Sequence, residues 1–171
     1  MSADRFITFA YGSNMPTARI RERCLSVQSL GVAELRGYEL RWHKKSKDGS
    51  GKCDIVQTDR PDASVFGVLY EIASNEKAGL DKAEGLGAGY DETEIEVFRG
   101  ADRLRAKAYV ATTTDPALTP YSWYRALVIA GAKEHRLPAD YIASLEAVPA
   151  NEDLDRERHA KNMALIGEVQ Q

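Results

Sequence analysis

The sequence has little cysteine. Its 171 residues include Cys24 and Cys53, and these two do not form a CxxC pair. Two isolated cysteines cannot supply the disulfide framework of a small secreted domain or the paired ligands of a structural zinc site. The first residues show no charged and then apolar leader. We therefore expect free thiols in a reduced, cytoplasmic protein.

Long apolar runs and an excess of positive charge are also missing. The longest apolar run, residues 126–132, is far shorter than the roughly 18 residues of a membrane span. The formal net charge of −3 gives no basic footprint for a nucleic acid or an anionic lipid surface. The basic cluster of His43, Lys44, Lys45 and Lys47 is more typical of a solvated strand end than of a binding patch. We expect no nucleic acid or membrane partner, and a monomer or homodimer.

The residue pattern predicts mostly strands first and helices last. Short segments rich in β-branched and aromatic residues predict strands at residues 6–10, 31–35, 38–43, 54–57, 65–72, 92–98 and 103–110. Helices are expected at residues 17–23, 75–84, 119–137, 138–145 and 151–166. This order favours an α+β fold with a mixed or closed sheet over a doubly wound one. No linker divides the chain, so residues 1–171 should form one domain, with 151–171 as a peripheral C-terminal helix.

Particular residues predict the helix ends and one turn. Ser74, Thr119-Pro120 and Asn151 are suited to begin helices, and Gly85 is suited to end one. Gly100-Ala101 should form a two-residue type II′ turn, because glycine is preferred at its first central position. That turn sets the register of its hairpin, with Glu96 opposite Arg105, Glu94 opposite Lys107 and Val97 opposite Leu104.

A short polar loop follows the first predicted strand and precedes the first predicted helix. It consists of Tyr11, Gly12, Ser13, Asn14 and Met15. Glycine and asparagine tolerate left-handed backbone, so successive N–H groups could converge on one point, beside a helix N-terminus. Such a loop is suited to bind a carboxylate or a developing oxyanion. A plain strand-to-helix turn uses the same residues.

Glu84 stands in the last turn of a predicted helix, before the glycine-rich residues 85–89. Because these glycines follow a helix rather than open one, they do not indicate a nucleotide loop. A carboxylate at this end of a helix is disfavoured by the helix dipole, by a few tenths to about 1 kcal/mol. If this carboxylate is also desolvated, its pKa rises towards the range that is useful for proton transfer, which suits a general acid and base. The alternative is an ordinary surface glutamate.

Other common catalytic sets lack support. The three histidines, His43, His135 and His159, are far apart and show no metal-ligand spacing. No base is evidently paired with Ser13, Cys24 or Cys53, so a serine or cysteine triad is not indicated.

Several motifs together resemble the γ-glutamylcyclotransferase family. They are residues 9–15 (FAYGSNM), Glu84-Gly85 with Gly89-Tyr90, and Tyr124 with residues 131–134 (GAKE) and 137–141 (LPADY). They occur in the order expected for the family and cover about residues 6–149. The resemblance implies a compact mixed β-barrel-like sheet flanked by helices.

The resemblance also implies an activity and its site. Family members cyclise γ-glutamyl amino acids or amines to 5-oxoproline with release of the amine, which belongs to glutathione-related metabolism, and they need no metal or organic cofactor. The family's catalytic glutamate maps onto Glu84, and its substrate cradle maps onto residues 11–15. Pocket-lining tyrosines map onto Tyr90 and Tyr124.

Three alternatives stay open at this stage. The chain could be a cyclotransferase for γ-glutamylamines, or a biosynthetic enzyme that removes a γ-glutamyl cap from a larger product. A more distant alternative is a non-catalytic barrel that binds a small molecule. Glu84 argues against the last, because its carboxylate would repel that of the substrate in a pure binding site.

Overall fold

The fold is described by a computed structural model that places residues 4–169. In chain order, its elements are β1 (Arg5–Ala10), α1 (Thr17–Arg23), β2 (Gln28–Arg36), β3 (Tyr38–Lys45), β4 (Gly51–Gln57), β5 (Ser64–Ala73), the 3₁₀ turn η1 (Ser74–Glu76), α2 (Lys77–Glu84), β6 (Tyr90–Arg99), β7 (Asp102–Ala111), α3 (Ser122–Glu134), α4 (Ala139–Glu146) and α5 (Arg156–Val169). Every predicted strand and helix has a counterpart here.

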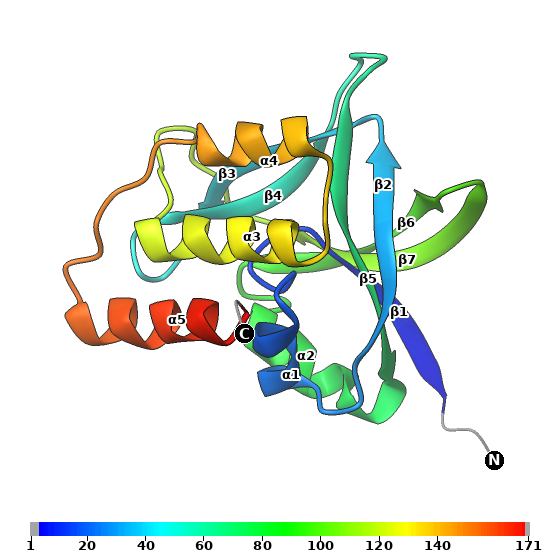
Figure 1. The fold of residues 1–171 in the computed structure, drawn as a ribbon, viewed down its shortest axis with the longest axis horizontal. Coiled ribbons are helices and arrows are strands. Elements are labelled where there is room, and N and C mark those ends of the chain that lie inside the picture. Colours follow the sequence, from blue (N-terminus) through cyan, green and yellow to red (C-terminus); the bar gives the residue numbers. More distant parts are fainter. Residues whose placement is uncertain (1–3, 170–171) are drawn as a thin grey trace.

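A closed barrel forms the centre of the molecule. Its strands follow the order β1-β5-β2-β6-β7, and the parallel pairing of β1 with β7, at Thr8 and Lys107, closes the ring. The other neighbours run antiparallel. The expectation of an α+β fold with a mixed, barrel-like sheet is therefore confirmed. Strands β3 and β4 form a separate two-stranded ribbon beside the barrel (Figure 1).

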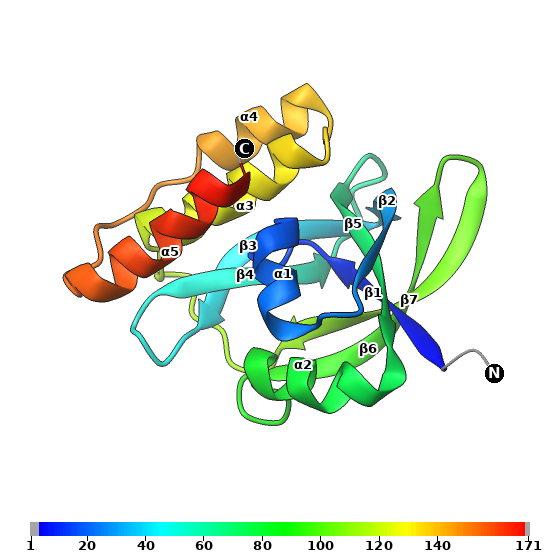
Figure 2. The same cartoon turned by 60° about the horizontal axis from the view of Figure 1, so that its bottom comes forward.

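The helices cover the barrel in two groups. Helices α3, α4 and α5 form a layer on one side, while α1 and α2 lie at one end of the barrel, with α1 between α5 and α2 (Figure 2). Helix α3 approaches the first loop closely at Gly131. A Cβ on Gly131 would lie 2.5 Å from Met15 Cβ and 2.7 Å from Pro16 Cδ, a distance that real contacts do not show. The absence of a side chain at Gly131 thus allows α3 to pack directly against Met15 and Pro16 at the end of the loop.

The β6–β7 hairpin has the predicted register. Glu96 lies opposite Arg105, Glu94 opposite Lys107 and Val97 opposite Leu104. Gly100 has φ +60°, and Ala101 is not among the residues with positive φ, as a type II′ turn requires. The charged ends pair diagonally rather than directly across: Arg105 reaches Glu94 at 3.3 Å.

Three predicted helix N-caps are wrong. Ser74 makes no side-chain cap, and the chain passes through η1 before α2 begins. Asn151 bridges to Tyr121 and donates to Thr119 Oγ1 at 2.6 Å, so its side chain is used between segments. Helix α5 begins five residues later, where Asp155 Oδ1 accepts from the Arg158 N–H at 3.0 Å. Thr119-Pro120 does not cap its helix either, because α3 begins at Ser122 and its N-cap is Tyr121.

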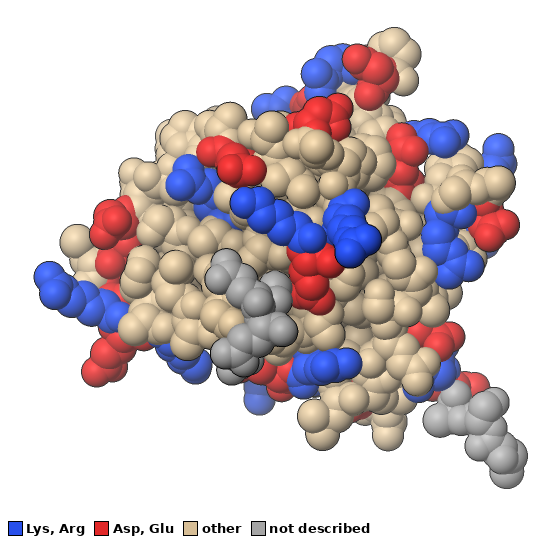
Figure 3. All heavy atoms as spheres, in the orientation of Figure 1, with Lys and Arg blue, Asp and Glu red and all other residues tan. Residues whose placement is uncertain are grey.

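The surface carries charges of both signs. Basic and acidic side chains are interspersed over the face in Figure 3, without the broad basic area of a nucleic-acid interface. Within residues 4–169, no helix is long and apolar enough to cross a membrane. Cys24 and Cys53 are free thiols, as predicted, and both are buried.

Candidate active site

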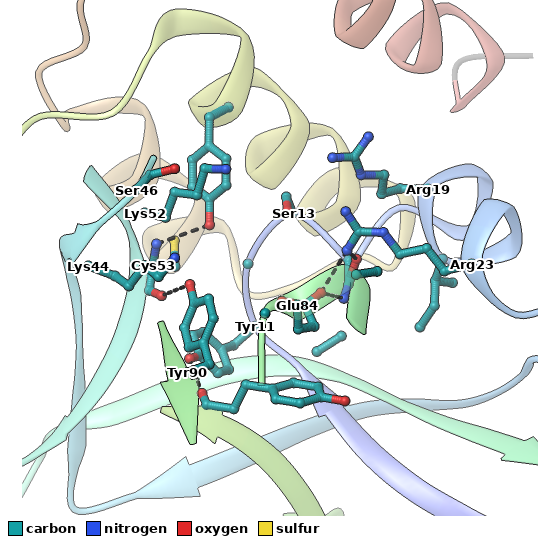
Figure 4. Close-up of a pocket in the computed structure, with 18 of the residues that line it drawn as sticks. Tyr11, Ser13, Arg19, Arg23, Lys44, Ser46, Lys52, Cys53, Glu84 and Tyr90 are labelled. Carbon is teal, nitrogen blue, oxygen red and sulfur yellow. Dashed lines mark hydrogen bonds and ion pairs between the residues drawn. The ribbon is translucent and has the colours of Figure 1, made fainter. Parts of the chain in front are cut away.

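A cavity of about 300 Å³ opens between the first loop and the end of α2. Its walls come from residues 11–14, from helix α1, from the last turn of α2 and from the β3–β4 ribbon. Figure 4 shows Glu84 near the middle of this cavity, the α1 arginines on one side and the ribbon lysines on the other. The residues for which sequence motifs predicted a site therefore come together, with one exception described below.

Glu84 is fixed at the cavity by two partners. Helix α2 ends directly after it, because Gly85 adopts left-handed backbone at φ +75°. Glu84 Oε1 accepts from Arg23 Nη1 at 2.6 Å and from Asn14 Nδ2. The same Arg23 Nη1 donates to Asn14 Oδ1 at 2.7 Å, so the three side chains form a closed set. The Glu84 side chain is 15% exposed, which leaves it reachable from the cavity.

Two opposing electrostatic effects act on the Glu84 carboxylate, one from the end of its own helix and one from Arg23. The end of a helix disfavours a carboxylate by up to about 1 kcal/mol. The Arg23 guanidinium, which is 19% exposed, offsets this as an opposite charge 2.6 Å from the Glu84 carboxylate. Sequence reasoning missed Arg23, since the pairing joins residues 61 positions apart.

The first loop presents backbone N–H donors to the cavity, but its backbone does not adopt the left-handed conformation that was expected. Left-handed backbone was predicted at Gly12 and Asn14, yet neither has positive φ. Glycine is favoured at position 12 for another reason: a Cβ would lie 3.1 Å from Tyr124 Oη and 3.2 Å from Cys53 Cβ, which is tighter than most real Cβ contacts. The N–H groups of Gly12, Ser13 and Asn14 find no acceptor in the described part of the chain. These donors border the cavity and are available to an anion.

The predicted tyrosines form the cavity wall with their hydroxyls already engaged. Tyr11 donates to the Tyr109 carbonyl, and Tyr90 donates to the Cys53 carbonyl at 2.8 Å. Tyr124 Oη accepts from the Cys53 N–H at 3.0 Å. Burial raises the pKa of all three phenols well above the ordinary value, so they stay protonated. As buried, protonated phenols they form part of the cavity wall.

Met15 is the exception among the predicted site residues. Its side chain is fully buried, and it is not part of the cavity lining. Its N–H donates to the Gly12 carbonyl at 3.1 Å, and its carbonyl accepts from Tyr70 Oη at 2.6 Å. Met15 thus fixes the loop from within the core and does not face the cavity.

The cavity lining is rich in cations that sequence reasoning did not assign to it. Arg19 and Arg23 come from α1, and Lys44 and Lys52 come from the ribbon. Lys44, Lys45 and Lys47 belong to the cluster interpreted as a solvated strand end, but all three line the cavity, so that interpretation is wrong for them. The signal was present in the composition of residues 43–47, but their side of the ribbon could not be read from the sequence.

Among residues 4–169, no group of three or more His, Cys, Asp or Glu side chains is arranged to bind a metal ion.

Comparisons with known proteins identify the family. The sequence model of the AIG2-like family matches residues 64–145. The chain is 32% identical over 162 residues to mouse gamma-glutamylcyclotransferase, covering 87% of this chain and 81% of the mouse protein. The human gamma-glutamylcyclotransferase is 30% identical over 156 residues, with the same coverage.

A solved structure supports the same assignment. A gamma-glutamyl cyclotransferase structure superposes with a TM-score of 0.84 at 26% identity, and covers 96% of this chain and 99% of that chain. The match extends over the barrel, the ribbon and the helices together. The chain therefore belongs to the γ-glutamylcyclotransferase family and is an enzyme of that type.

Proposed function

We propose that this enzyme converts γ-glutamyl compounds to 5-oxoproline and a free amine, with Glu84 as the general acid and base. The observation that carries the proposal is the composition of the cavity wall. Among the described residues that line it, Glu84 is the one carboxylate, and there is no histidine. The tyrosine hydroxyls are engaged, and burial raises the pKa of the Cys53 thiol. Glu84 is therefore the carboxylate placed to accept a proton and to return it.

The reaction needs proton transfer because the substrate supplies its own nucleophile. The α-amine of a γ-glutamyl group has an ordinary pKa of about 8, so it is mostly an ammonium at neutral pH. Glu84 takes one proton, the freed amine attacks the γ-carbonyl carbon, and a new C–N bond closes the five-membered ring. The bond to the leaving nitrogen then breaks as Glu84 returns a proton to that nitrogen. The ring nitrogen gives up two protons in all, and the leaving amine departs with both.

The cavity also provides binding for the negative groups of such a substrate. The free N–H groups of Gly12, Ser13 and Asn14 can bind the α-carboxylate or the oxyanion of the tetrahedral intermediate. Loss of one oxyanion donor typically costs about 10²–10³-fold in rate. Holding the glutamyl chain folded, with amine and carbonyl in contact, supplies the proximity that a flexible chain lacks in water.

The charge of the cavity bears on the leaving group. Arg19, Arg23, Lys44 and Lys52 surround a single carboxylate, so a leaving group that carries a positive charge would meet repulsion. A γ-glutamyl polyamine or a γ-glutamyl cap on a polycationic product is therefore a poorer candidate than a neutral or anionic substrate. We place the reaction in the cytoplasm, where free thiols such as Cys24 and Cys53 stay reduced.

A substrate panel tests the proposal. The purified enzyme is incubated with γ-glutamyl dipeptides and γ-glutamylamines, and 5-oxoproline and free amine are quantified together. The expected result is equimolar release of both products from at least one dipeptide. Release of glutamate instead of 5-oxoproline would indicate hydrolysis and would overturn the cyclisation.

A further inference from the structure

Helix α1 supplies the arginines that stand beside Glu84. Arg19 and Arg23 both line the cavity, and Figure 4 shows them on the same side of Glu84. Arg23 Nη1 lies 2.6 Å from Glu84 Oε1 and 2.7 Å from Asn14 Oδ1, so the position of α1 sets this contact. The helix has only seven residues, and at 1.5 Å per residue its first and last residues are about 9 Å apart. Whatever holds the ends of α1 therefore also holds Arg23.

The start of α1 is capped by a residue from another helix. Its own N-cap, Pro16, makes no side-chain hydrogen bond, and its first turn contains no acidic residue. The first N–H groups of a helix need acceptors from outside the helix. Glu134, the last residue of α3, provides them: Oε1 accepts from the Thr17 N–H at 3.1 Å, and Oε2 accepts from the Thr17 hydroxyl. The helix dipole also favours a carboxylate at this end.

A second carboxylate holds the chain directly after α1. Glu76 Oε1 accepts from the Leu25 N–H at 2.9 Å, and its Oε2 accepts from the Ser26 N–H at 3.1 Å and from the Ser26 hydroxyl. The hydrogen bond from the Ser26 side chain is the main cause that holds the pKa of Glu76 below its ordinary value. Glu76 immediately precedes α2, the helix that ends at Glu84. It therefore ties the end of α1 to the start of the helix that carries Glu84.

These two carboxylates act on α1 and not on the cavity itself. Neither of them is part of the cavity lining. The loop before α1 is anchored separately, because the Met15 carbonyl accepts from Tyr70 Oη at 2.6 Å and lies 3.0 Å from His135 Nε2. The buried side chain of Ile20 keeps α1 in the core. Loss of either carboxylate should therefore shift α1 slightly, without detaching it and without moving the loop donors.

We propose that Glu76 and Glu134 are positioning residues that hold α1 from both ends and thereby set Arg23 against Glu84. This inference rests on the proposed role of Glu84 in the cyclisation. It gives a function to the GAKE motif, whose glutamate lies outside the cavity. Neither residue touches substrate or transfers a proton.

Alanine variants test the effect on turnover. Glu134→Ala and Glu76→Ala should each lower kcat at least about fivefold, because small misplacement of a reacting group is costly, and should leave KM within about threefold. Glu134→Gln keeps an amide oxygen for the Thr17 N–H and should lose less than Glu134→Ala. Glu146→Ala removes an exposed carboxylate of α4 outside the cavity and should behave as wild type. If an alanine variant fails to fold, the glutamine variant at the same position takes its place, with a smaller loss expected.

A double-variant cycle separates positioning from general destabilisation. Arg23→Met removes the guanidinium whose placement is at issue. In this background, adding Glu134→Ala or Glu76→Ala should change kcat by less than about twofold, since the contact to be positioned is already gone. A general loss of stability would lower kcat by the same factor in both backgrounds. If Arg23→Met turns over too slowly to measure, Arg23→Lys is the second background, because lysine does not reproduce the guanidinium contacts.

Amide hydrogen exchange, followed by mass spectrometry, tests the support of α1 without reference to activity. Exchange in residues 17–26 should be at least about tenfold faster in both alanine variants than in wild type, while α4 should be unchanged. Unchanged exchange in this segment would overturn the proposal. Full kcat in either alanine variant would overturn the role of that glutamate, and equal losses in both Arg23 backgrounds would overturn positioning through Arg23; the cyclisation would stand in each case. No 5-oxoproline from the wild-type enzyme would overturn the proposed function, and the positioning role with it.

Discussion

The Tyr109 hydroxyl on β7 donates to Asp81 Oδ1 on α2 at 2.5 Å. Asp81 stands one helical turn before Glu84, so this bond fixes the end of α2 against the barrel. Burial, and the adjacent Asp81 carboxylate, raise the pKa of Tyr109 far above its ordinary value, which keeps the phenol a donor. The main chain of Tyr109 also accepts from Tyr11, so the same residue is tied to the loop.

Tyr109→Phe should therefore act on catalysis through the placement of Glu84. We expect kcat to fall about tenfold to a hundredfold, because small misplacement of a reacting group is costly, while KM changes little. A purely structural role would lower thermal stability without this split between kcat and KM. Tyr141→Phe, which removes a hydroxyl on α4 outside the cavity, is the matched control. Equal kcat in Tyr109→Phe and wild type would contradict the positioning role.

Gly12→Ala should impair substrate binding. The added Cβ would meet Tyr124 Oη and Cys53 Cβ at 3.1 and 3.2 Å, so the loop or these side chains have to shift by a few tenths of an ångström. We expect kcat/KM to fall at least about tenfold, in proportion to the lost donor geometry. Gly79→Ala on α2, where nothing lies within 4 Å of the new Cβ, should retain activity and gain slightly in stability. Full activity in Gly12→Ala would show that the loop donors are not used.

The two thiols should be unreactive in the folded enzyme. Burial raises the pKa of Cys24 to about 11 and that of Cys53 further, so almost no thiolate is present at pH 8. Labelling by iodoacetamide at pH 8, followed by mass spectrometry, should be at least about 100-fold slower than after unfolding in guanidinium chloride. Rapid labelling of either cysteine in active enzyme would contradict the burial of that thiol.

The hydrogen bonds of Asp153 that join α5 to α3 should contribute less to stability at low pH. Asp153 is buried and accepts from Trp123 Nε1 at 2.8 Å and from Arg158 Nε at 2.5 Å. Arg158 is the main cause that holds the pKa of Asp153 well below its ordinary value. Because the folded state favours the ionised form, this contribution to stability is complete above the unfolded pKa of about 3.9 and is lost as the pH falls below it.

Asp153→Asn tests this linkage. The variant should have a lower Tm than wild type at pH 7, and the difference should narrow as the pH falls from about 5 towards 2. Circular dichroism melting curves across this range measure it. A difference in Tm that stays constant with pH would show that the charge of Asp153 does not contribute.

What the sequence predicted correctly was mostly local. The strand at β1, the short helix α1 and the Gly100-Ala101 turn depend on neighbouring residues, and all three were found. The Asn151 cap failed because Thr119, 32 residues earlier, competes for its side chain. Contacts between residues so far apart in the sequence cannot be predicted from the local residue pattern.

The candidate site divides in the same way. Glu84 and residues 11–14 were identified by motifs, since each is a contiguous segment with a distinctive composition. Arg23 and Lys44 were missed because their contribution arises only when α1 packs near α2 and the ribbon folds back. The ribbon has a register shift between Arg41 and Lys44, so simple alternation could not assign the side on which Lys44 lies.

In the proposed reaction, Glu84 transfers the proton. Glu84→Gln keeps the shape of the side chain and can still accept from Arg23, but it cannot act as a base. Substrate should bind at least as tightly, since repulsion between two carboxylates is relieved. Glu146→Gln, an exposed residue of α4, is the matched control and should behave as wild type.

The most direct measurement is the rate of 5-oxoproline release from the best substrate of the panel, with folding and substrate binding of each variant verified by circular dichroism and calorimetry. Glu84→Gln is expected to bind substrate and to lose at least about 10²-fold in kcat, as for the loss of general acid/base catalysis. A folded Glu84→Gln enzyme that releases 5-oxoproline within about threefold of the wild-type rate would contradict a role of Glu84 in proton transfer.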